Sequence, residues 1–147
     1  MTKEVRLAAM NLLARREHSQ QELHRKLVNK GFESTDIKPA LATLAKQGLL
    51  SDERFTEAFI NSRLKRGSGP IKIAMELQQR GISDELVAQY LDERDTQWAE
   101  SAVAVRLKRF GAALPKDFTE RARQMRFLQY RGFTMQQIQH AVGEEID

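Results

Sequence analysis

Three glycines at nearly equal intervals constrain this chain more than any other feature. Gly31, Gly81 and Gly132 stand 50 and then 51 residues apart, and a leucine lies four residues before each of them. A large apolar residue follows each glycine directly, and two more apolar residues lie six and ten positions after it. Self-similarity at such a period indicates one supersecondary unit used three times. The shared pattern predicts a helix that ends at a C-cap glycine, an apolar residue that closes the turn, and a second helix that packs back.

Helical periodicity extends over almost the whole chain. Apolar residues in the segments around Val5 and Ile37 recur at i, i+3, i+4, i+7 and i+8, which places them on one face of a helix. Capping-box patterns occur at Ser19-x-x-Glu22, Asp117-x-x-Glu120 and Thr134-x-x-Gln137. We find no convincing alternation of apolar and polar β-branched residues. These signals predict an all-α fold.

A longer amphipathic segment precedes each repeated helix pair, at residues 3–16, 52–65 and 96–110. The chain is therefore predicted to form three tandem three-helix repeats, at 1–50, 51–95 and 96–147, in an elongated, curved array. Pro70 suits the first position of a helix after the turn Gly67-Ser68-Gly69, whereas Pro39 predicts a late or irregular start for the helix begun near Ser34. Trp98, the only tryptophan, is expected in the core or between repeats.

Charge is distributed unevenly over the predicted helices. The net charge of +4 divides into +5 over the first helices of the repeats, +6 over the middle helices and −7 over the third helices. The cations of the first and middle helices are predicted to form one extended basic surface, which would favour a polyanionic partner. They are Arg15, Arg16, Arg25, Lys26, Lys30, Arg63, Lys65, Arg66, Lys72, Arg80, Arg106, Lys108, Arg109, Arg121, Arg123, Arg126 and Arg131. At the carboxyl-terminal end, Phe127 and Tyr130 border Arg126 and Arg131 and are predicted to form a contact cluster, with Phe127 equally suited to the core.

A helix-turn-helix reader of DNA bases is the obvious competitor, because a helix, a glycine turn and a second helix make its outline. The second helix would then enter the major groove. In the second repeat that helix carries Asp84, Glu85, Asp92 and Glu93, and in the third it carries three glutamines with Glu144 and Glu145. Phosphates repel these acidic residues. Any nucleic-acid contact is therefore expected to come from the first and middle helices and to be made with the DNA backbone rather than with the bases.

Catalysis finds little support in the sequence. Gly67-Ser68-Gly69 lacks the preceding strand and the Lys-Ser/Thr of a phosphate-binding loop, and no nucleophile, base and orienting group occur in recognisable order. The chain has no cysteine, and His18, His24 and His140 do not have metal-ligand spacing. No uninterrupted apolar run exceeds four residues, as in Leu7–Met10, which is far below the roughly 20 of a membrane-spanning helix. We expect a cytoplasmic protein that is not an enzyme and holds no cofactor or metal.

Four motifs follow one another along the chain. Glu22–Leu27 leads to Gly31-Phe32, Gly48–Phe55 joins the first two repeats, Ser62–Pro70 precedes Glu76-Leu77 and Gly81-Ile82, and Arg126–Phe133 ends the series. In this order they resemble the RecX family, the bacterial regulators of the RecA recombinase. The resemblance covers nearly the whole chain. The chain has Leu49 and Ser68 where the family commonly has Tyr, and Ser51 where it commonly has Asp.

The resemblance implies three tandem three-helix repeats and a non-enzymatic protein that lodges in the groove of the RecA filament on DNA. Such a protein limits filament extension and restrains ATP hydrolysis, strand exchange and co-protease activity. Our leading hypothesis is a monomer that binds RecA and its filament, with DNA as a further direct partner. Its predicted contacts include Arg25, Lys26, Lys65, Arg66, Lys72, Arg126 and Arg131, with Lys30, Arg63, Arg80, Arg121 and Arg123 as further candidates. The alternative is a sequence-independent nucleic-acid-binding module that affects RecA only by occupying DNA.

Overall fold

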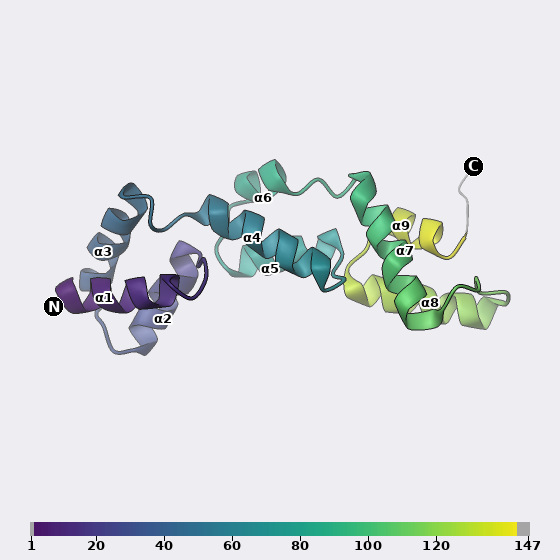
Figure 1. The fold of residues 1–147 in the computed structure, drawn as a ribbon, viewed down its shortest axis with the longest axis horizontal. Coiled ribbons are helices and arrows are strands. Elements are labelled where there is room, and N and C mark those ends of the chain that lie inside the picture. Colours follow the sequence, from purple (N-terminus) through teal and green to yellow (C-terminus); the bar gives the residue numbers. More distant parts are fainter. Residues whose placement is uncertain (1, 144–147) are drawn as a thin grey trace. The chain divides into compact units, whose positions relative to one another are not determined.

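The computed structural model describes residues 2–143, and in that range its regular secondary structure consists of α-helices, without strands (Figure 1). The prediction of an all-α fold is therefore confirmed. Glu144 and Glu145 lie outside the described residues. The helices are α1 (Thr2–Leu13), α2 (Gln20–Asn29), α3 (Ser34–Lys46), α4 (Asp52–Lys65), α5 (Pro70–Gln79), α6 (Asp84–Tyr90), α7 (Thr96–Phe110), α8 (Phe118–Arg131) and α9 (Met135–Ala141).

Local signals place most helix ends where the sequence predicts them. α4 and α7 have the predicted bounds, and α5 begins at Pro70, whose missing N–H has no intrahelical partner at that position. The Ser19 hydroxyl accepts from the Glu22 N–H at 3.0 Å, and Asp117 Oδ1 accepts from the Glu120 N–H at 2.8 Å. At Thr134 the capping box is complete, since the Gln137 side chain also accepts from the Thr134 N–H at 2.9 Å.

The three repeated glycines end their helices by the same device. Gly31, Gly81 and Gly132 have φ values of 100°, 80° and 99°, in the left-handed region that glycine adopts without strain. The N–H of the residue after each glycine donates to the carbonyl of the leucine that lies four residues before it, at 3.1–3.3 Å. This is a Schellman motif. Leu27, Leu77 and Leu128 are fully buried, so the repeated Leu…Gly pattern both closes the turn and places a core residue.

The predicted late start of the helix at Pro39 is wrong. α3 begins at Ser34 and runs through Pro39, and the Ile37 N–H already donates to the Glu33 carbonyl at 3.0 Å. Proline removes one hydrogen bond, to the carbonyl of Thr35, and Thr35 is exposed to water. Ile37, Leu41 and Leu44 are buried on the inner face of the helix, and this packing holds α3 helical through the proline.

The described residues fall into two compact units. The first unit contains the chain up to Phe59 together with Leu77–Val87, and the second contains Ile60–Glu76 together with the residues after Val87. Each unit therefore takes part of the middle repeat. The predicted repeat boundaries at residues 50 and 95 stay a prediction.

Each unit has its own apolar core. In the first unit, α1, α2 and α3 enclose Val5, Ala9, Leu23, Leu27, Ile37, Leu41, Leu44 and Leu50 (Figure 1). In the second unit, α7, α8 and α9 enclose Ala102, Leu128, Phe133, Ile138, Ala141 and Val142. Trp98, near the start of α7, is 1% exposed, which confirms its predicted burial. None of the described helices is both long and apolar enough to cross a membrane.

In each unit, the start of a middle helix packs against the glycine turn of the next repeat. The start of α2 contacts the turn at Gly81, and the start of α5 contacts the turn at Gly132. In the first unit the Ser19 hydroxyl donates to the Arg80 carbonyl at 2.7 Å, and Gln21 lies against Gly81. In the second unit the Gly69 N–H donates to the Arg131 carbonyl at 2.7 Å, and Lys72 lies against Gly132. We call these contacts the first junction (residues 16–22 with Arg80 and Gly81) and the second junction (residues 66–72 with Arg131 and Gly132).

Candidate functional site

An open cleft of about 380 Å³ lies beside the second junction, and cations dominate its walls. Lys65 and Arg66 come from the end of α4, Lys108 and Arg109 from the last turns of α7, and Arg131 from the end of α8. Leu64, Ala104 and Val105 supply an apolar floor, and Ser101 and Gly67 complete the lining. None of the described residues that line the cleft is acidic.

One face of α7 forms a wall of this cleft. The lining residues Ser101, Ala104, Val105, Lys108 and Arg109 follow i, i+3, i+4, i+7 and i+8, so they share one side of the helix. The buried residues Trp98, Ala102 and Arg106 lie on the adjoining side of α7. The core therefore fixes the direction in which Lys108 and Arg109 point.

Arg131 holds the opposite wall in place. Its Nη1 donates to the carbonyls of Arg66 and Gly67 at 3.0 Å and 3.3 Å, which lie just after the end of α4. Its guanidinium carbon lies 5.1 Å from the centre of the Phe127 ring, and the guanidinium carbon of Arg109 lies 5.5 Å from the same ring. Cation–π contacts thus bring two of the five cations to the same aromatic ring.

The turn Gly67-Ser68-Gly69 is a docking surface for backbone. The N–H groups of Gly69 and Ile71 donate to the carbonyls of Arg131 and Gly132 at 2.7 Å and 2.9 Å. A β-carbon on Gly69 would collide with the backbone of Gly132 and Phe133. The interpretation as a turn into the Pro70 helix is confirmed, and these two N–H groups are occupied by the protein itself.

The first junction pairs its arginines with carboxylates. Glu22 accepts from both terminal nitrogens of Arg16, at 2.9 Å and 3.0 Å, and lies 3.9 Å from Nε of Arg80. Glu17 accepts from Nε of Arg54 at 2.9 Å. Burial is the largest single influence on Glu22 and favours its protonated form, but the hydrogen bonds and charge of Arg16, together with neighbouring His18 and Lys26, outweigh it and lower the pKa of this carboxyl. The Arg80 guanidinium also lies 4.8 Å from the Phe59 ring centre.

His18 and Lys26 form a hydrogen-bonded pair beside this carboxylate. Lys26 Nζ donates to His18 Nε2 at 2.9 Å, because an ammonium group has no acceptor. His18 Nδ1 therefore carries the proton and donates to the Arg16 carbonyl at 3.1 Å. Burial lowers the pKa of His18, which is 1% exposed, and also lowers the pKa of Lys26. Lys26 therefore stabilises the first junction rather than standing free for a partner.

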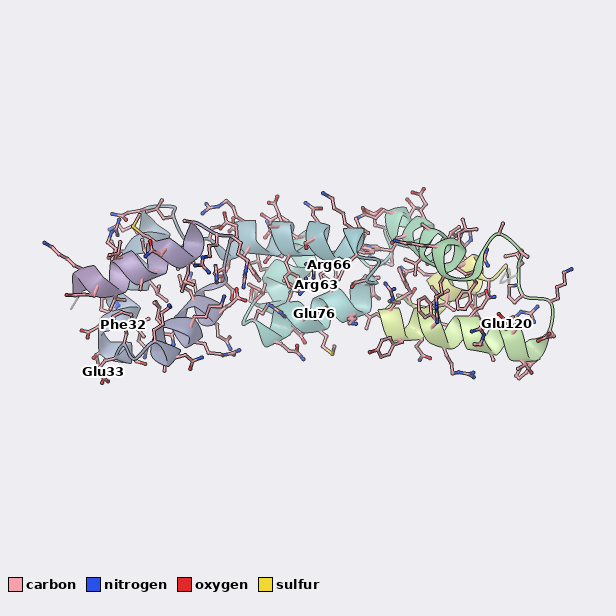
Figure 2. The ribbon with its side chains drawn as sticks, turned by 60° about the horizontal axis from the view of Figure 1, so that its bottom comes forward. Phe32, Glu33, Arg63, Arg66, Glu76 and Glu120 are labelled. Carbon is pink, nitrogen blue, oxygen red and sulfur yellow. The ribbon has the colours of Figure 1, made fainter. Side chains whose placement is uncertain are left out.

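The remaining predicted contacts lie in varied surroundings. Arg63 pairs with Glu76 at 3.4 Å, and Figure 2 shows the two side chains between α4 and α5. Lys72 Nζ lies 5.1 Å from the ring centre of Tyr130, which is 78% exposed. Arg123 pairs with Glu120 at 3.1 Å, near the start of α8 in Figure 2. Arg25, Lys30 and Arg126 are exposed, and Arg121 is half-buried.

Arg106 corrects the predicted basic surface. It is 2% exposed, and its Nη1 donates to the Ala113 carbonyl at 3.3 Å and to Gln124 Oε1 at 3.4 Å. Arg106 therefore supports the loop after α7 and does not belong to the surface. Lys108 and Arg109 belong to the predicted basic surface but not to the predicted RecA or DNA contacts. The structure places them in the cleft, seven and eight residues after Ser101 on the same face of α7.

No group of three or more His, Asp or Glu side chains in residues 2–143 is placed to hold a metal ion. The lining of the cleft consists of cations, three apolar residues, Ser101 and Gly67. Such a lining can bind an anion.

Family models match all three repeats of the chain. They describe the first, second and third three-helix domains of RecX, and they match residues 6–44, 51–91 and 95–142. The regulatory protein RecX of Halorhodospira halophila is 47% identical over 139 residues, covering 95% of this chain and 86% of that protein. The regulatory protein RecX of Pseudomonas entomophila is 46% identical over 134 residues, covering 91% and 86%. A crystal structure of RecX from Lactobacillus salivarius has the same fold, with a TM-score of 0.81 at 19% identity over 97% of this chain and 94% of that one.

Proposed function

Because the chain belongs to the RecX family of regulatory proteins, we propose that it regulates the RecA recombinase by binding RecA and the RecA filament on DNA. The match of all three domains, in order and over most of the chain, carries this proposal. In this proposal the protein acts in the cytoplasm, without catalytic chemistry of its own. It lodges in the filament groove, limits filament extension, and inhibits RecA ATP hydrolysis, strand exchange and co-protease activity.

The charges of the chain support binding to a repetitive, anionic assembly. Exposed cations occur in more than one repeat, at Arg25 on α2, Lys65 and Arg66 at the end of α4, and Arg126 on α8. Several weak contacts carried by linked domains raise the effective concentration of each contact, so no single pair has to be strong. Basic side chains also accelerate encounter with anionic surfaces.

The structure narrows the contacts that we propose for this binding. Lys26 donates to His18, Lys72 covers Tyr130, and Arg131 holds the end of α4. Substitution of these three residues would disturb the fold as well as a partner. We therefore assign the first role in filament binding to Arg25, Lys65, Arg66 and Arg126.

The test is ATP hydrolysis by RecA filaments preassembled on single-stranded DNA, with DNA in large excess, during titration with this protein. We expect inhibition at protein concentrations well below that of RecA. The variant Arg25→Gln/Lys65→Gln/Arg66→Gln/Arg126→Gln should lose most of this inhibition while keeping its helical circular dichroism. The control Lys3→Gln/Lys38→Gln/Lys46→Gln/Lys116→Gln removes the same charge at four exposed positions and should inhibit as the parent does. Equal inhibition by both variants would refute the assigned contacts.

The same titration separates this proposal from a module that acts only by occupying DNA. Such a module would bind naked DNA tightly, and the excess of DNA would remove its effect on preassembled filaments. Absence of inhibition together with intact binding to naked DNA would therefore refute regulation through the filament.

A further inference from the structure

The two junctions are equivalent in the repeat but differ in charge. With the 50-residue offset between Gly31 and Gly81, Arg16 corresponds to Arg66, Glu17 to Gly67 and Glu22 to Lys72. The contacts agree with this alignment, since Ser19 and its counterpart Gly69 donate to the carbonyl that precedes a glycine turn. Both acidic residues of the first junction are thus replaced, one by glycine and the other by lysine.

This replacement leaves the second junction with uncompensated positive charge. In the first junction, Glu17 and Glu22 pair with Arg54, Arg16 and Arg80. In the second, the five cations of the cleft have no acidic neighbour among its described lining residues. Like charges held together repel one another, and an anion in the cleft would relieve that repulsion. Arg66 and Arg131 correspond to Arg16 and Arg80, so the second junction keeps two cations whose counterparts in the first junction share the carboxylate of Glu22.

The form of the cleft favours a phosphodiester chain over an isolated carboxylate. The cleft is open, and its volume of about 380 Å³ exceeds the needs of one carboxylate and falls within the range of about 300–1,000 Å³ of small-molecule sites. Its cations stand in two pairs, Lys65 with Arg66 and Lys108 with Arg109, on two different helix ends. A strand with closely and regularly spaced phosphates can meet both pairs at once. The apolar floor and the planar guanidinium groups suit sugar and base surfaces between the phosphates.

We infer that the cleft between the end of α4, the outer face of α7 and Arg131 is a binding site for single-stranded nucleic acid, which it holds by its phosphodiester backbone. Lys65, Arg66, Lys108 and Arg109 contact the phosphates, and Arg131 positions the wall that carries the first pair. The contact is independent of base sequence, because the cleft offers cations and donors but no fixed pattern of acceptors. This inference goes beyond the proposed function, since it gives the cleft a ligand of its own that binds without RecA.

The test uses fluorescence anisotropy of a labelled oligo(dT) at several salt concentrations. Lys65→Gln/Lys108→Gln removes one cation from each pair, and both residues are exposed. We expect the variant to bind roughly tenfold or more weakly near 0.1 M salt, with the slope of log K against log salt smaller by about 1.4, because each single-strand phosphate contact contributes about 0.7. Lys46→Gln/Lys116→Gln, with the same change in net charge outside the cleft, should retain the parent's affinity and slope.

A second probe, an oligoglutamate peptide of equal charge, separates nucleic acid from an acidic protein segment. Equal oligo(dT) affinities of the cleft and control variants would overturn the assignment. So would a loss of binding to oligoglutamate alone, which would identify the cleft as a site for acidic protein. The assay contains no RecA, so its failure is distinct from failure of the filament assay.

Discussion

Replacement of Gly69 by alanine tests the docking of one repeat on the next. A β-carbon at this position would collide with backbone atoms of Gly132 and Phe133, which have no flexible end that can move aside. The two backbones must separate, and the hydrogen bonds from Gly69 to Arg131 and from Ile71 to Gly132 must lengthen or break. The perturbation acts inside the second unit and leaves the core of α1, α2 and α3 untouched.

The expected loss of stability follows from these two effects. Each backbone hydrogen bond contributes about 0.5–1.5 kcal/mol net, and the introduction of an extra group into a packed contact costs about 1–3 kcal/mol. Gly69→Ala should therefore destabilise the second unit by about 2–6 kcal/mol. With a urea dependence of about 1–3 kcal/mol per molar, the midpoint of unfolding should fall by about 1 M or more.

Trp98 makes this change measurable in the second unit alone, because it is the only tryptophan of the chain and is buried there. Urea unfolding is followed by tryptophan fluorescence, with circular dichroism for the whole chain. Gly31→Ala is the control: Gly31 has φ +100° and open space around it, so alanine there brings backbone strain of about 1–2 kcal/mol without a collision. An unchanged fluorescence midpoint in Gly69→Ala would refute the docking of α5 on the glycine turn of α8.

Three further outcomes follow from particular contacts. Burial lowers the pKa of His18 below its ordinary value of 6.5, so the unfolded chain binds the proton more readily than the folded chain does. The free energy of unfolding should therefore decrease as the pH falls below about 6.5. Urea titrations between about pH 7.5 and 5 should show this decrease, and His18→Gln should flatten it. Glu22→Gln removes the carboxylate that Arg16 and Arg80 share and should lower the free energy of unfolding at neutral pH by about 1–3 kcal/mol, and a loss no larger than that of an exposed Glu→Gln variant would contradict the pairing. Leu128→Ala should lower the free energy of unfolding, followed by Trp98 fluorescence, by about 2–5 kcal/mol, because Leu128 is fully buried. A decrease below about 1 kcal/mol would contradict the place of Leu128 in the core.

The helices and turns follow largely from local sequence. The side chain of a Ser, Asp or Thr at a helix start accepts a hydrogen bond from an N–H two or three residues later. A glycine with positive φ ends a helix through hydrogen bonds that span six residues or fewer. These signals act over one or two helical turns, so the printed sequence contains all the groups involved. Apolar periodicity predicts α4 and α7 with the observed bounds, and Pro70 predicts the start of α5.

Predictions that depend on surroundings are less successful. Pro39 has an unfavourable local preference, but three buried residues of α3 hold the helix on its core. Arg106 has the charge of a surface residue and is nonetheless buried, because the carbonyl of Ala113 and the amide of Gln124 receive its donors. In both cases the deciding partners lie outside the local pattern.

The sequence by itself determined the class of fold, the three repeats, the turn that ends each middle helix and the excess of cations on the first and middle helices. These properties depend on periodicity and on groups only a few residues apart. Only the tertiary structure decided which cations pair with acids and which line a cleft. Arg131 meets Arg66 across 65 residues of chain, and Gly69 requires glycine because Gly132 approaches it. Packing of distant helices creates these neighbours, so no local pattern contains them.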